Sequence, residues 1–365
     1  MDAVSDPSTP SDPSTPPPSS ADRVLVTGGS GFLGAHCVLA LLDAGYRVRT
    51  TVRSPARSAD VRSQLAAGGV DDPGDRLEFA IADLTSDDGW ADAVAGCRYV
   101  LHVASPFPST QPKDPDDLIV PARDGALRVL RAARAAGVER VVLTSSFAAI
   151  GYGHAPTDRA FTEEDWTELD SGRPLTAYVR SKTIAERSAW AFVDTEPGAL
   201  QLATVNPVGI LGPVLGPDIS TSVELIRLVK EGRLPRLPDV HFGVVDVRDV
   251  AALHLLAMTR PEAAGQRFLA MAGEVMSAQE IALLIRGHLG ERAGRRVSTK
   301  LMPEWMLKAA APFSRRVRDA LPDIGTVRRA SGEKARTVLG WAPRSREEAV
   351  LATVDTLPTY HPRRR

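Results

Sequence analysis

A tyrosine and a lysine lie four residues apart, at Tyr178 and Lys182. In a helix this spacing puts both side chains on one face, one turn apart. A free tyrosine has a pKa of about 10, which suits proton transfer at neutral pH poorly, and a neighbouring cation stabilises the phenolate and lowers that pKa. Such a phenol can protonate a carbonyl oxygen as hydride arrives, or accept the proton in the reverse reaction. The alternative interpretation is a packing aromatic beside an exposed helix charge.

A hydroxyl that would hold the substrate oxygen is expected after the strand Arg140–Thr144, where Ser145 and Ser146 follow. The carboxyl end of that strand should lie beside the start of the Tyr178 helix, and a serine there could donate a hydrogen bond to the carbonyl oxygen. Adjacent residues of an extended chain point in opposite directions, so only one of the two serines faces the site. Periodicity leaves open which one. His102 could serve as a base, but a hydrogen-bonded histidine at a strand end is the simpler interpretation.

Three glycines, Gly28, Gly31 and Gly34, stand between the apolar run Val24–Val26 and the amphipathic stretch Phe32–Ala44. This context predicts a strand that passes into a helix around a pyrophosphate. Gly28 would allow the tight turn, Gly31 the close approach of the backbone, and Gly34 close packing of the helix on the sheet. The N–H groups of the helix N-terminus would face the anion.

The end of the second expected strand, Arg47–Val52, indicates which dinucleotide is bound. NAD-preferring sites carry an acidic residue there, and this chain has none. Arg53 stands at the tip, with Arg57 further on, and a guanidinium can hold a 2′-phosphate through paired hydrogen bonds. The sequence therefore favours NADP(H), with NAD(H) still possible and a solvated surface arginine as the alternative for Arg53. Asp83, after the third strand, could bind the adenine amino group or cap the next helix.

Short apolar runs alternate with helical patterns from Arg23 onward. Runs such as Val141–Leu143 are apolar throughout, which is typical of parallel strands buried on both faces. The pattern predicts an α/β fold with a Rossmann-type doubly wound parallel sheet. The expected strands are Arg23–Thr27, Arg47–Val52, Leu77–Ile81, Tyr99–Val103, Arg140–Thr144 and Gln201–Asn206. The expected helices between them are Phe32–Ala44, Ala59–Ala67, Gly89–Ala95, Pro121–Ala136 and Thr176–Asp194.

After Asn206 the rhythm changes, and prolines and glycines interrupt the chain. Residues 23–206 are expected to form the NADP-binding domain, completed by about 241–271. Residues 207–240 and 272–355 are expected to form a smaller C-terminal substrate-binding lobe over the carboxyl ends of the strands, where open α/β sheets bind ligands. The later expected helices are Ser222–Lys230, Val247–Thr259, Ala278–Leu289 and Pro303–Pro312, and the later strands are Phe242–Val245 and Arg267–Met271.

The two ends of the chain and its composition exclude several classes of protein. Residues 1–22 are rich in proline, serine and threonine, lack the apolar core of a signal peptide, and are expected to be disordered. Residues 356–365 form a basic tail.

The net charge of −1 gives no reason to expect nucleic acid or an anionic membrane as partner, and no apolar run reaches the roughly 18 residues of a membrane span. Cys37 and Cys97 lack metal-ligand spacing, so no metal is expected; as buried free thiols they suit a cytoplasmic protein.

The glycine pattern T-G-G-x-G-x-x-G, the Ser-Ser pair after a later strand and the Tyr-x-x-x-Lys motif beyond it resemble the extended short-chain dehydrogenase/reductases of the NAD-dependent epimerase/dehydratase superfamily. The resemblance runs from about Arg23 to Pro343, and its dihydroflavonol reductase-like branch, which includes aldehyde and ketone reductases, is the most similar. Further matching phrases are Thr51–Arg53, His102–Phe107, Thr144–Ala149, Asn206–Val208 and Val245–Ala251.

The resemblance implies a site. It assigns the catalytic roles to Ser146, Tyr178 and Lys182, and it also gives Lys182 the nicotinamide ribose hydroxyls. The implied cofactor-binding residues are Gly28, Gly31, Phe32, Leu33, Gly34, Arg53, Asp83, Leu84, Ala104, Tyr178, Lys182, Pro207 and Val208. Position alone suggests Phe107, Phe147 and Tyr152 for the substrate.

The chain also departs from its relatives. Asp124 stands where many of them carry an asparagine, which puts an asparagine-dependent proton relay in doubt. The run Leu175–Tyr178 lacks the aromatic and cysteine-bearing motif of plant cinnamoyl-CoA reductases, and this argues against that activity.

The expected function is reduction of an aldehyde or ketone to the alcohol by hydride transfer from NADPH. Tyr178 would donate the proton, Lys182 would lower its pKa, and Ser146 would polarise the carbonyl. The expected partner is a small-molecule carbonyl substrate, and the protein is expected to be a monomer or homodimer. A nucleotide-sugar epimerase or dehydratase and a hydroxysteroid dehydrogenase are alternatives on the same scaffold. Arg53 argues against the epimerase, and retention of Tyr178 and Lys182 argues against a non-catalytic NADP-sensing regulator.

Overall fold

The computed structural model describes residues 22–106, 112, 114–196, 198–310, 312 and 321–357. The expected disordered segment at the N-terminus (all but its last residue), Phe107 and most of the expected basic tail lie outside the described residues. Among the described residues, no helix has the length and apolarity needed to cross a bilayer.

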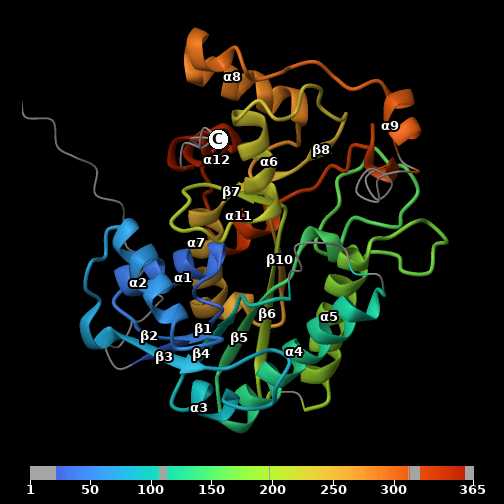
Figure 1. Cartoon of the computed structure of the whole chain (residues 1–365). Helices are drawn as coiled ribbons and strands as arrows, with labels where there is room; N and C mark the ends of the chain where they lie inside the picture. The colour runs from blue at the N-terminus through green and yellow to red at the C-terminus, as the bar shows by residue number, and fades with distance from the viewer. Residues whose placement is uncertain are drawn as a thin grey trace, which may run out of the picture.

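A seven-stranded parallel sheet forms the centre of the molecule, with the strand order β10-β6-β5-β4-β1-β2-β3 (Figure 1). The order reverses direction at β1, as in a doubly wound sheet, so the predicted Rossmann-type α/β fold is confirmed. The strands are β1 Arg23–Thr27, β2 Arg47–Val52, β3 Leu77–Ile81, β4 Tyr99–His102, β5 Arg140–Thr144, β6 Gln201–Pro207 and β10 Arg267–Ala270.

Helices cover both faces of this sheet (Figure 1). On β1, Val24 and Val26 belong to one apolar core and Leu25 to the other, because successive side chains of a strand alternate between faces. All three are fully buried, and each contributes on the order of 2 kcal/mol of apolar burial. One face carries α1 Phe32–Asp43, α2 Arg57–Ala67, α7 Val247–Thr259 and α11 Glu333–Leu339, and the other carries α3 Trp90–Val94, α4 Asp116–Ala135 and α5 Ala177–Asp194.

A second unit, called the lobe below, lies beyond the carboxyl ends of the strands (Figure 1). It has its own apolar core, to which three of its helices contribute, at Thr221–Lys230, Ala278–Gly294 and Arg346–Thr356. Two short sheets belong to it or border it, one pairing β7 Gly209–Leu211 with β9 Val244–Asp246 and one pairing β8 His241–Phe242 with β11 Met276–Ser277. Its helices are α6 Thr221–Lys230, α8 Ala278–Gly294, α9 Glu304–Ala310 and α12 Arg346–Thr356.

Residues 321–357 are the last described segment of the chain, and their hydrogen bonds fix two loops near the site. The loop after β5 is fixed at Phe161, whose N–H donates to the Arg329 carbonyl at 2.9 Å and whose carbonyl accepts from the Ser331 N–H at 2.9 Å. The loop after β7 is fixed at Gly212, whose N–H donates to the Thr353 hydroxyl of α12 at 2.6 Å. Both loops therefore depend on residues far away in sequence.

The elements that differ from the expected ones include α4, the strand expected at Phe242–Val245 and α12. Helix α4 begins at Asp116 rather than Pro121, and Pro121 lies inside it. The expected strand Phe242–Val245 is broken at Gly243, where a Cβ would press on the Val208 side chain. Helix α12 was not predicted, although Ser345 and the residue three positions later form a capping box at its start. The two cysteines are buried and unpaired, as expected.

Candidate active site

The turn after β1 is closed so tightly that Gly28, Gly29 and Gly34 leave no room for a side chain. Gly28 has a φ of +71°, and the Gly31 N–H donates to the Gly28 carbonyl at 3.0 Å. A Cβ on Gly34 would lie far inside van der Waals distance of the Gly28 carbonyl oxygen. Gly34 thus packs on the turn itself, not on the sheet as predicted. A Cβ on Gly29 would overlap the Thr50 hydroxyl, so this glycine is also required.

The N-terminus of α1 is open toward this turn. Its N-cap is Gly31, and the first turn, all of it described, has neither a side-chain cap nor an acidic residue. The N–H groups at Phe32 and Leu33 therefore remain available to an anion. The narrow glycine turn and the uncapped helix together fit a pyrophosphate, so the residues present suit a dinucleotide.

Ala104, which follows β4, lies against the glycine turn. A Cβ on Gly28 would come within 3.0 Å of the Ala104 Cβ, and the Ala104 N–H donates to the Thr27 hydroxyl at 2.9 Å. Thr27 also pairs with Nδ1 of His102 at 2.8 Å. His102 is buried, and burial lowers its pKa to about 3. It is therefore neutral at pH 7, which suits a hydrogen-bonded strand-end residue better than a base.

The residues expected near the adenosine lie at the ends of β2 and β3. Arg53 is exposed at the tip of β2. Asp83 accepts hydrogen bonds from the N–H and hydroxyl of Thr85 at 2.8 and 2.6 Å, and these lower its pKa. Asp83 thus closes a local turn and does not cap α3, whose N-cap is Gly89. Leu84 packs against Gly125 of α4.

Arg57 makes a connection that the sequence did not indicate. Its guanidinium donates to the Ser30 hydroxyl of the glycine turn at 3.0 Å and pairs with Asp218 of the lobe. Nearby, Nε2 of His36 on α1 lies 2.9 Å from the Pro213 carbonyl. The lobe is therefore linked to the glycine turn through Arg57 and contacts α1 through His36.

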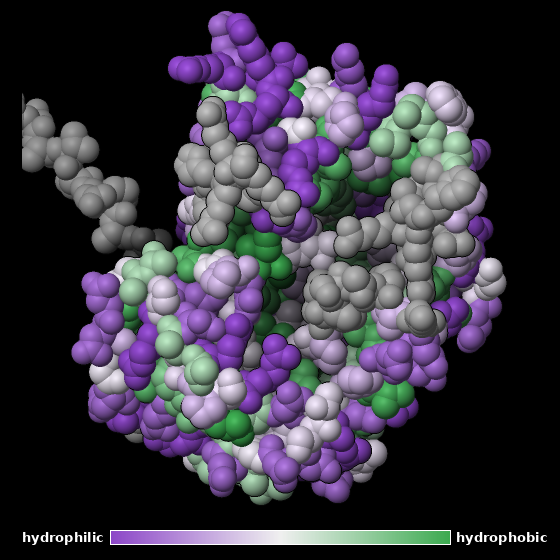
Figure 2. Space-filling view, in the orientation of Figure 1, coloured by the Kyte–Doolittle hydropathy of each residue, from purple (hydrophilic) through white to green (hydrophobic). Residues whose placement is uncertain are grey.

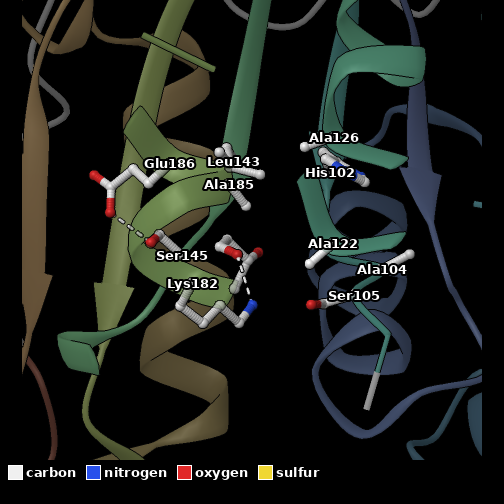
Figure 3. Close-up of a pocket in the computed structure, with 11 residues that line it drawn as sticks. His102, Ala104, Ser105, Ala122, Ala126, Leu143, Ser145, Lys182, Ala185 and Glu186 are labelled. Atoms are coloured by element: carbon white, nitrogen blue, oxygen red, sulfur yellow. Dashed lines mark hydrogen bonds between the residues drawn. The ribbon is translucent and has the colours of Figure 1, made fainter. Parts of the chain in front are cut away.

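The structure resolves the choice between the two serines. Ser146 has an extended backbone, accepts the Ala148 N–H at 3.1 Å, and forms a side-chain hydrogen bond with Tyr178. Ser145 points the opposite way, and its buried hydroxyl donates to Glu186 at 2.5 Å (Figure 3). Ser146 is therefore the serine that faces the phenol, in agreement with the position that the resemblance implied.

Tyr178 and Lys182 lie on one face of α5, which begins after the capping residue Thr176. Lys182 is buried and its Nζ donates to the Thr144 carbonyl at 3.4 Å. Burial lowers the pKa of Lys182 to about 8, and Glu186 acts in the opposite direction. The pKa of Tyr178 is raised by burial, although the hydrogen bond with Ser146 lowers it. The expected lowering of the Tyr178 pKa is therefore wrong for this structure, because burial outweighs the effects that favour the phenolate.

The end of β6 reaches the same site. Pro207 is its last residue, and the Val208 N–H donates to the Ala270 carbonyl of β10 at 3.2 Å. Asn206, just before them, donates to the Ser146 carbonyl at 3.3 Å. The structure thus places Pro207 and Val208 beside the Ser146 segment, at the carboxyl ends of β5 and β6.

A small pocket adjoins Lys182 between α4 and α5 (Figure 3). Its walls combine the alanines of α4 with polar groups from α5 and the ends of β4 and β5. Sequence reasoning missed one of these polar groups, Glu186, although it lies four residues after Lys182 and so on the same helix face. The lining residues include His102, Ala104, Ser105, Ala122, Ala126, Ser145, Lys182 and Glu186.

Two of the three expected substrate residues lie together. The Phe147 ring centroid is 6.1 Å from those of Tyr152 and Phe161. The Arg328 guanidinium lies over the Tyr152 ring at 4.4 Å. The pKa of Tyr152 is raised to about 12 by burial, with smaller contributions from Asp323 and Tyr178. In the view of Figure 2, the surface of the molecule is hollowed between the part that contains the central sheet and the lobe. Apolar residues lie along part of this hollow.

Acid is expected to destabilise the fold through two buried histidines, His102 and His254. His254 pairs with the Thr144 hydroxyl at 2.7 Å and the Val250 carbonyl at 2.8 Å, and burial lowers its pKa to about 4. Both folded pKa values lie below the unfolded value of about 6.5. As pH falls below that value, the unfolded chain binds protons that the folded chain does not, so each histidine lowers the free energy of unfolding by about 1.4 kcal/mol per pH unit.

Urea unfolding measured between about pH 6.5 and pH 4.5 checks this expectation. His254→Gln keeps a donor and an acceptor at the site and should remove one histidine's share of the slope. A free energy of unfolding that does not change with pH in this window would contradict the prediction.

The sequence of this chain is similar to those of known proteins. A model described as the NAD dependent epimerase/dehydratase family matches residues 24–270. The chain is 38% identical over 251 residues to a Medicago truncatula protein named cinnamoyl-CoA reductase CAD2, covering 67% of this chain and 75% of that protein. It is 34% identical over 289 residues to a Candida albicans protein named putative NADPH-dependent methylglyoxal reductase GRP2. That match covers 73% of this chain and 83% of that protein. The chain therefore belongs to the NAD-dependent epimerase/dehydratase family.

Solved structures support the same assignment. Candida albicans Gre2 in complex with NADPH superposes with a TM-score of 0.75 and 27% identity, covering 92% of this chain and 98% of that one. Yeast methylglyoxal/isovaleraldehyde reductase Gre2 with NADPH superposes with a TM-score of 0.74 and 25% identity, and the superposition covers the same shares of the two chains. The predicted resemblance to extended short-chain dehydrogenase/reductases is confirmed, and the chain is an NAD(P)-dependent oxidoreductase.

Proposed function

We propose that this protein reduces an aldehyde or ketone to the alcohol with NADPH. The observation that carries the proposal is the side-chain hydrogen bond between Ser146 and Tyr178, on the helix face that also bears Lys182. This group lies at the carboxyl ends of the strands, the edge from which the glycine turn also emerges. Relatives whose names describe NADPH-dependent reductases support this reading.

The cofactor would lie along that edge. Its pyrophosphate would bind the glycine turn and the open N-terminus of α1, and its 2′-phosphate would bind Arg53. Ala104, Pro207 and Val208 would border the nicotinamide half, and Asp83 and Leu84 the adenine. When bound, NADPH supplies the hydride that reduces the carbonyl carbon.

The chain's own residues would handle the proton. The Tyr178 hydroxyl donates its proton to the carbonyl oxygen while the Ser146 hydroxyl donates a hydrogen bond to the same oxygen. Reduction requires the protonated phenol, and the raised pKa of Tyr178 keeps it protonated at neutral pH. Lys182, as an ammonium, stabilises the phenolate that forms and would hold the ribose hydroxyls.

The substrate would be a small carbonyl compound with an apolar or aromatic portion. Phe147 and Tyr152 present ring surfaces near Tyr178, and Phe107 is the third proposed contact. We expect the active species to be a monomer or homodimer.

A screen of NADPH oxidation over aldehydes, ketones, flavonoids and steroids tests the proposal, with each assay repeated with NADH. The expected result is consumption of NADPH with at least one carbonyl class and formation of the matching alcohol. Conversion of a nucleotide sugar, with no carbonyl in the screen reduced, would overturn it.

Arg53→Ala is expected to weaken NADPH binding by about tenfold or more and to leave NADH binding nearly unchanged, because only NADPH carries the 2′-phosphate. Titration of nucleotide fluorescence gives both dissociation constants. Arg62→Ala is the matched control, since Arg62 lies nearby on α2 over the Phe79 ring. Equal weakening of both nucleotides would count against the phosphate contact.

A further inference from the structure

The carboxylate of Glu186 is fully buried and is shared among five donors. Its Oε2 accepts from the Ser145 hydroxyl at 2.5 Å and the Asn206 amide at 2.7 Å. Its Oε1 accepts from Nε of Arg267 at 2.7 Å, from the Thr204 hydroxyl at 3.1 Å and from the indole N–H of Trp190 at 3.4 Å. A buried carboxylate with this set of donors is held in one position.

Two of these donors belong to segments that form the proposed active site. Ser145 precedes the serine that faces Tyr178, and Asn206 precedes the Pro207 segment at the end of β6. Glu186 itself lies on α5, one turn beyond Lys182 and on the same face, so its carboxylate meets β5, β6 and α5 together (Figure 3).

We propose that Glu186 is the positioning residue of this site, whose buried carboxylate keeps Lys182 charged and fixes the Ser146 and Pro207 segments relative to Tyr178. The proposal rests on the reductase function proposed above and assigns a residue that acts through its neighbours and touches neither cofactor nor substrate.

The charges around Lys182 support this role. Tyr178 and Glu186 share one face of α5 with Lys182, and the neutral His102 of β4 lines the same pocket, while α4 contributes only alanines to the pocket wall. Behind Glu186 lies Arg267 of β10, which is also buried. Without Glu186, two cations would share one buried region with no anion between them, and the ammonium would be the one to lose its proton.

A purely structural ion pair between Glu186 and Arg267 is the competing interpretation. Arg267 has other partners, however: it donates to the carbonyls of Glu163 and Asp165 at 2.6 and 2.8 Å and lies over the Trp166 ring at 3.7 Å. Among the described residues, the only carboxylate that acts on Lys182 is Glu186. Arg267 would therefore keep these partners without Glu186, whereas Lys182 would lose the carboxylate that acts on it.

Glu163 provides a matched control. It is buried, accepts the Leu269 N–H at 2.8 Å and borders the same Arg267, yet none of its hydrogen bonds reaches Ser146, Tyr178 or Lys182. Glu163→Gln and Glu186→Gln thus make the same chemical change in the same buried network. Only the second removes the charge beside Lys182.

The direct test measures the protonation of Lys182 without turnover. The chain has six lysines, so NMR titration of protein labelled at lysine Cε, with Lys182→Arg for assignment, follows this ammonium alone. Glu186→Gln should lower the pKa of Lys182 by one unit or more, a tenfold change in proton affinity, and Glu163→Gln should leave it unchanged. An unchanged Lys182 titration in Glu186→Gln would overturn the proposal.

Glu186→Asp keeps the charge, and it tests the proposal even where Glu186→Gln does not fold. In the Glu186→Asp variant, the pKa of Lys182 should stay within about half a unit of the wild-type value. A fall of a full unit would show that the shape of the network, and not the charge, controls Lys182.

Activity gives an independent readout. In Glu186→Gln, the alkaline fall of kcat for carbonyl reduction should move to lower pH in step with the Lys182 titration, with no such movement in Glu163→Gln. A uniform loss of kcat at every pH would mean a structural role only. A wild-type protein that reduces no carbonyl would refute the proposed function, while the NMR titration would still decide the role of Glu186.

Discussion

Tyr178→Phe should lower the turnover of carbonyl reduction by on the order of a hundredfold or more while NADPH binding stays nearly intact. The substitution removes one oxygen atom and with it the proton donor, and it leaves the ring and the helix face in place. Ser146 loses its partner but retains the Ala148 N–H, so the local backbone should hold. The measurements are kcat with a substrate from the screen and the NADPH dissociation constant by fluorescence.

Tyr46→Phe is the control for this experiment. Tyr46 is also buried, but it packs in the apolar core beside α1 and away from the Ser146 segment. Its kcat should match that of the wild type. Unchanged turnover in Tyr178→Phe would remove this phenol from the mechanism.

Gly34→Ala should abolish measurable NADPH binding, a loss of at least about a hundredfold. The new methyl group would overlap the Gly28 carbonyl oxygen, which is backbone and cannot move aside as a flexible side chain could. The turn would have to open, and the N–H groups at the start of α1 would no longer converge on the pyrophosphate. Nucleotide titration and thermal unfolding should be measured together, because the turn also joins β1 to α1.

Gly287→Ala in α8 is the matched control. A Cβ there meets nothing within 4 Å, and the backbone does not adopt a positive φ. Alanine favours a helix over glycine by about 1 kcal/mol, so this variant should be slightly more stable and should bind NADPH normally. Retained binding in Gly34→Ala would show that the glycine turn does not hold the cofactor.

The strands of the central sheet could be predicted because their sequence pattern is local. β5 occupies Arg140–Thr144 in the structure, as predicted, since a short apolar run buried on both faces leaves little freedom in its bounds. The start of α4 could not be placed in the same way. Proline favours the first helical turn, in agreement with the expected start at Pro121, but Asp116 and Asp117 complement the helix dipole five residues earlier.

The site was predictable as far as it depends on spacing along one helix or one strand end. Tyr178 and Lys182 share a face because they are four residues apart, and alternation placed the two serines on opposite sides. The partners of Glu186 come from β5, β6 and β10, so no local pattern indicates them. The direction of the Tyr178 pKa likewise depends on burial by the surrounding structure, which spacing does not determine.

The hydrogen bond that holds Gly212 to Thr353 also has a consequence for the order in which the molecule is made. Synthesis proceeds from the N-terminus, and domains begin to fold as they emerge from the ribosome. The glycine turn and the first five strands can assemble early, but the loop beside them gains its anchor only when α12 has been translated. The loop after β7 is therefore among the last parts of the molecule to be fixed in the nascent chain.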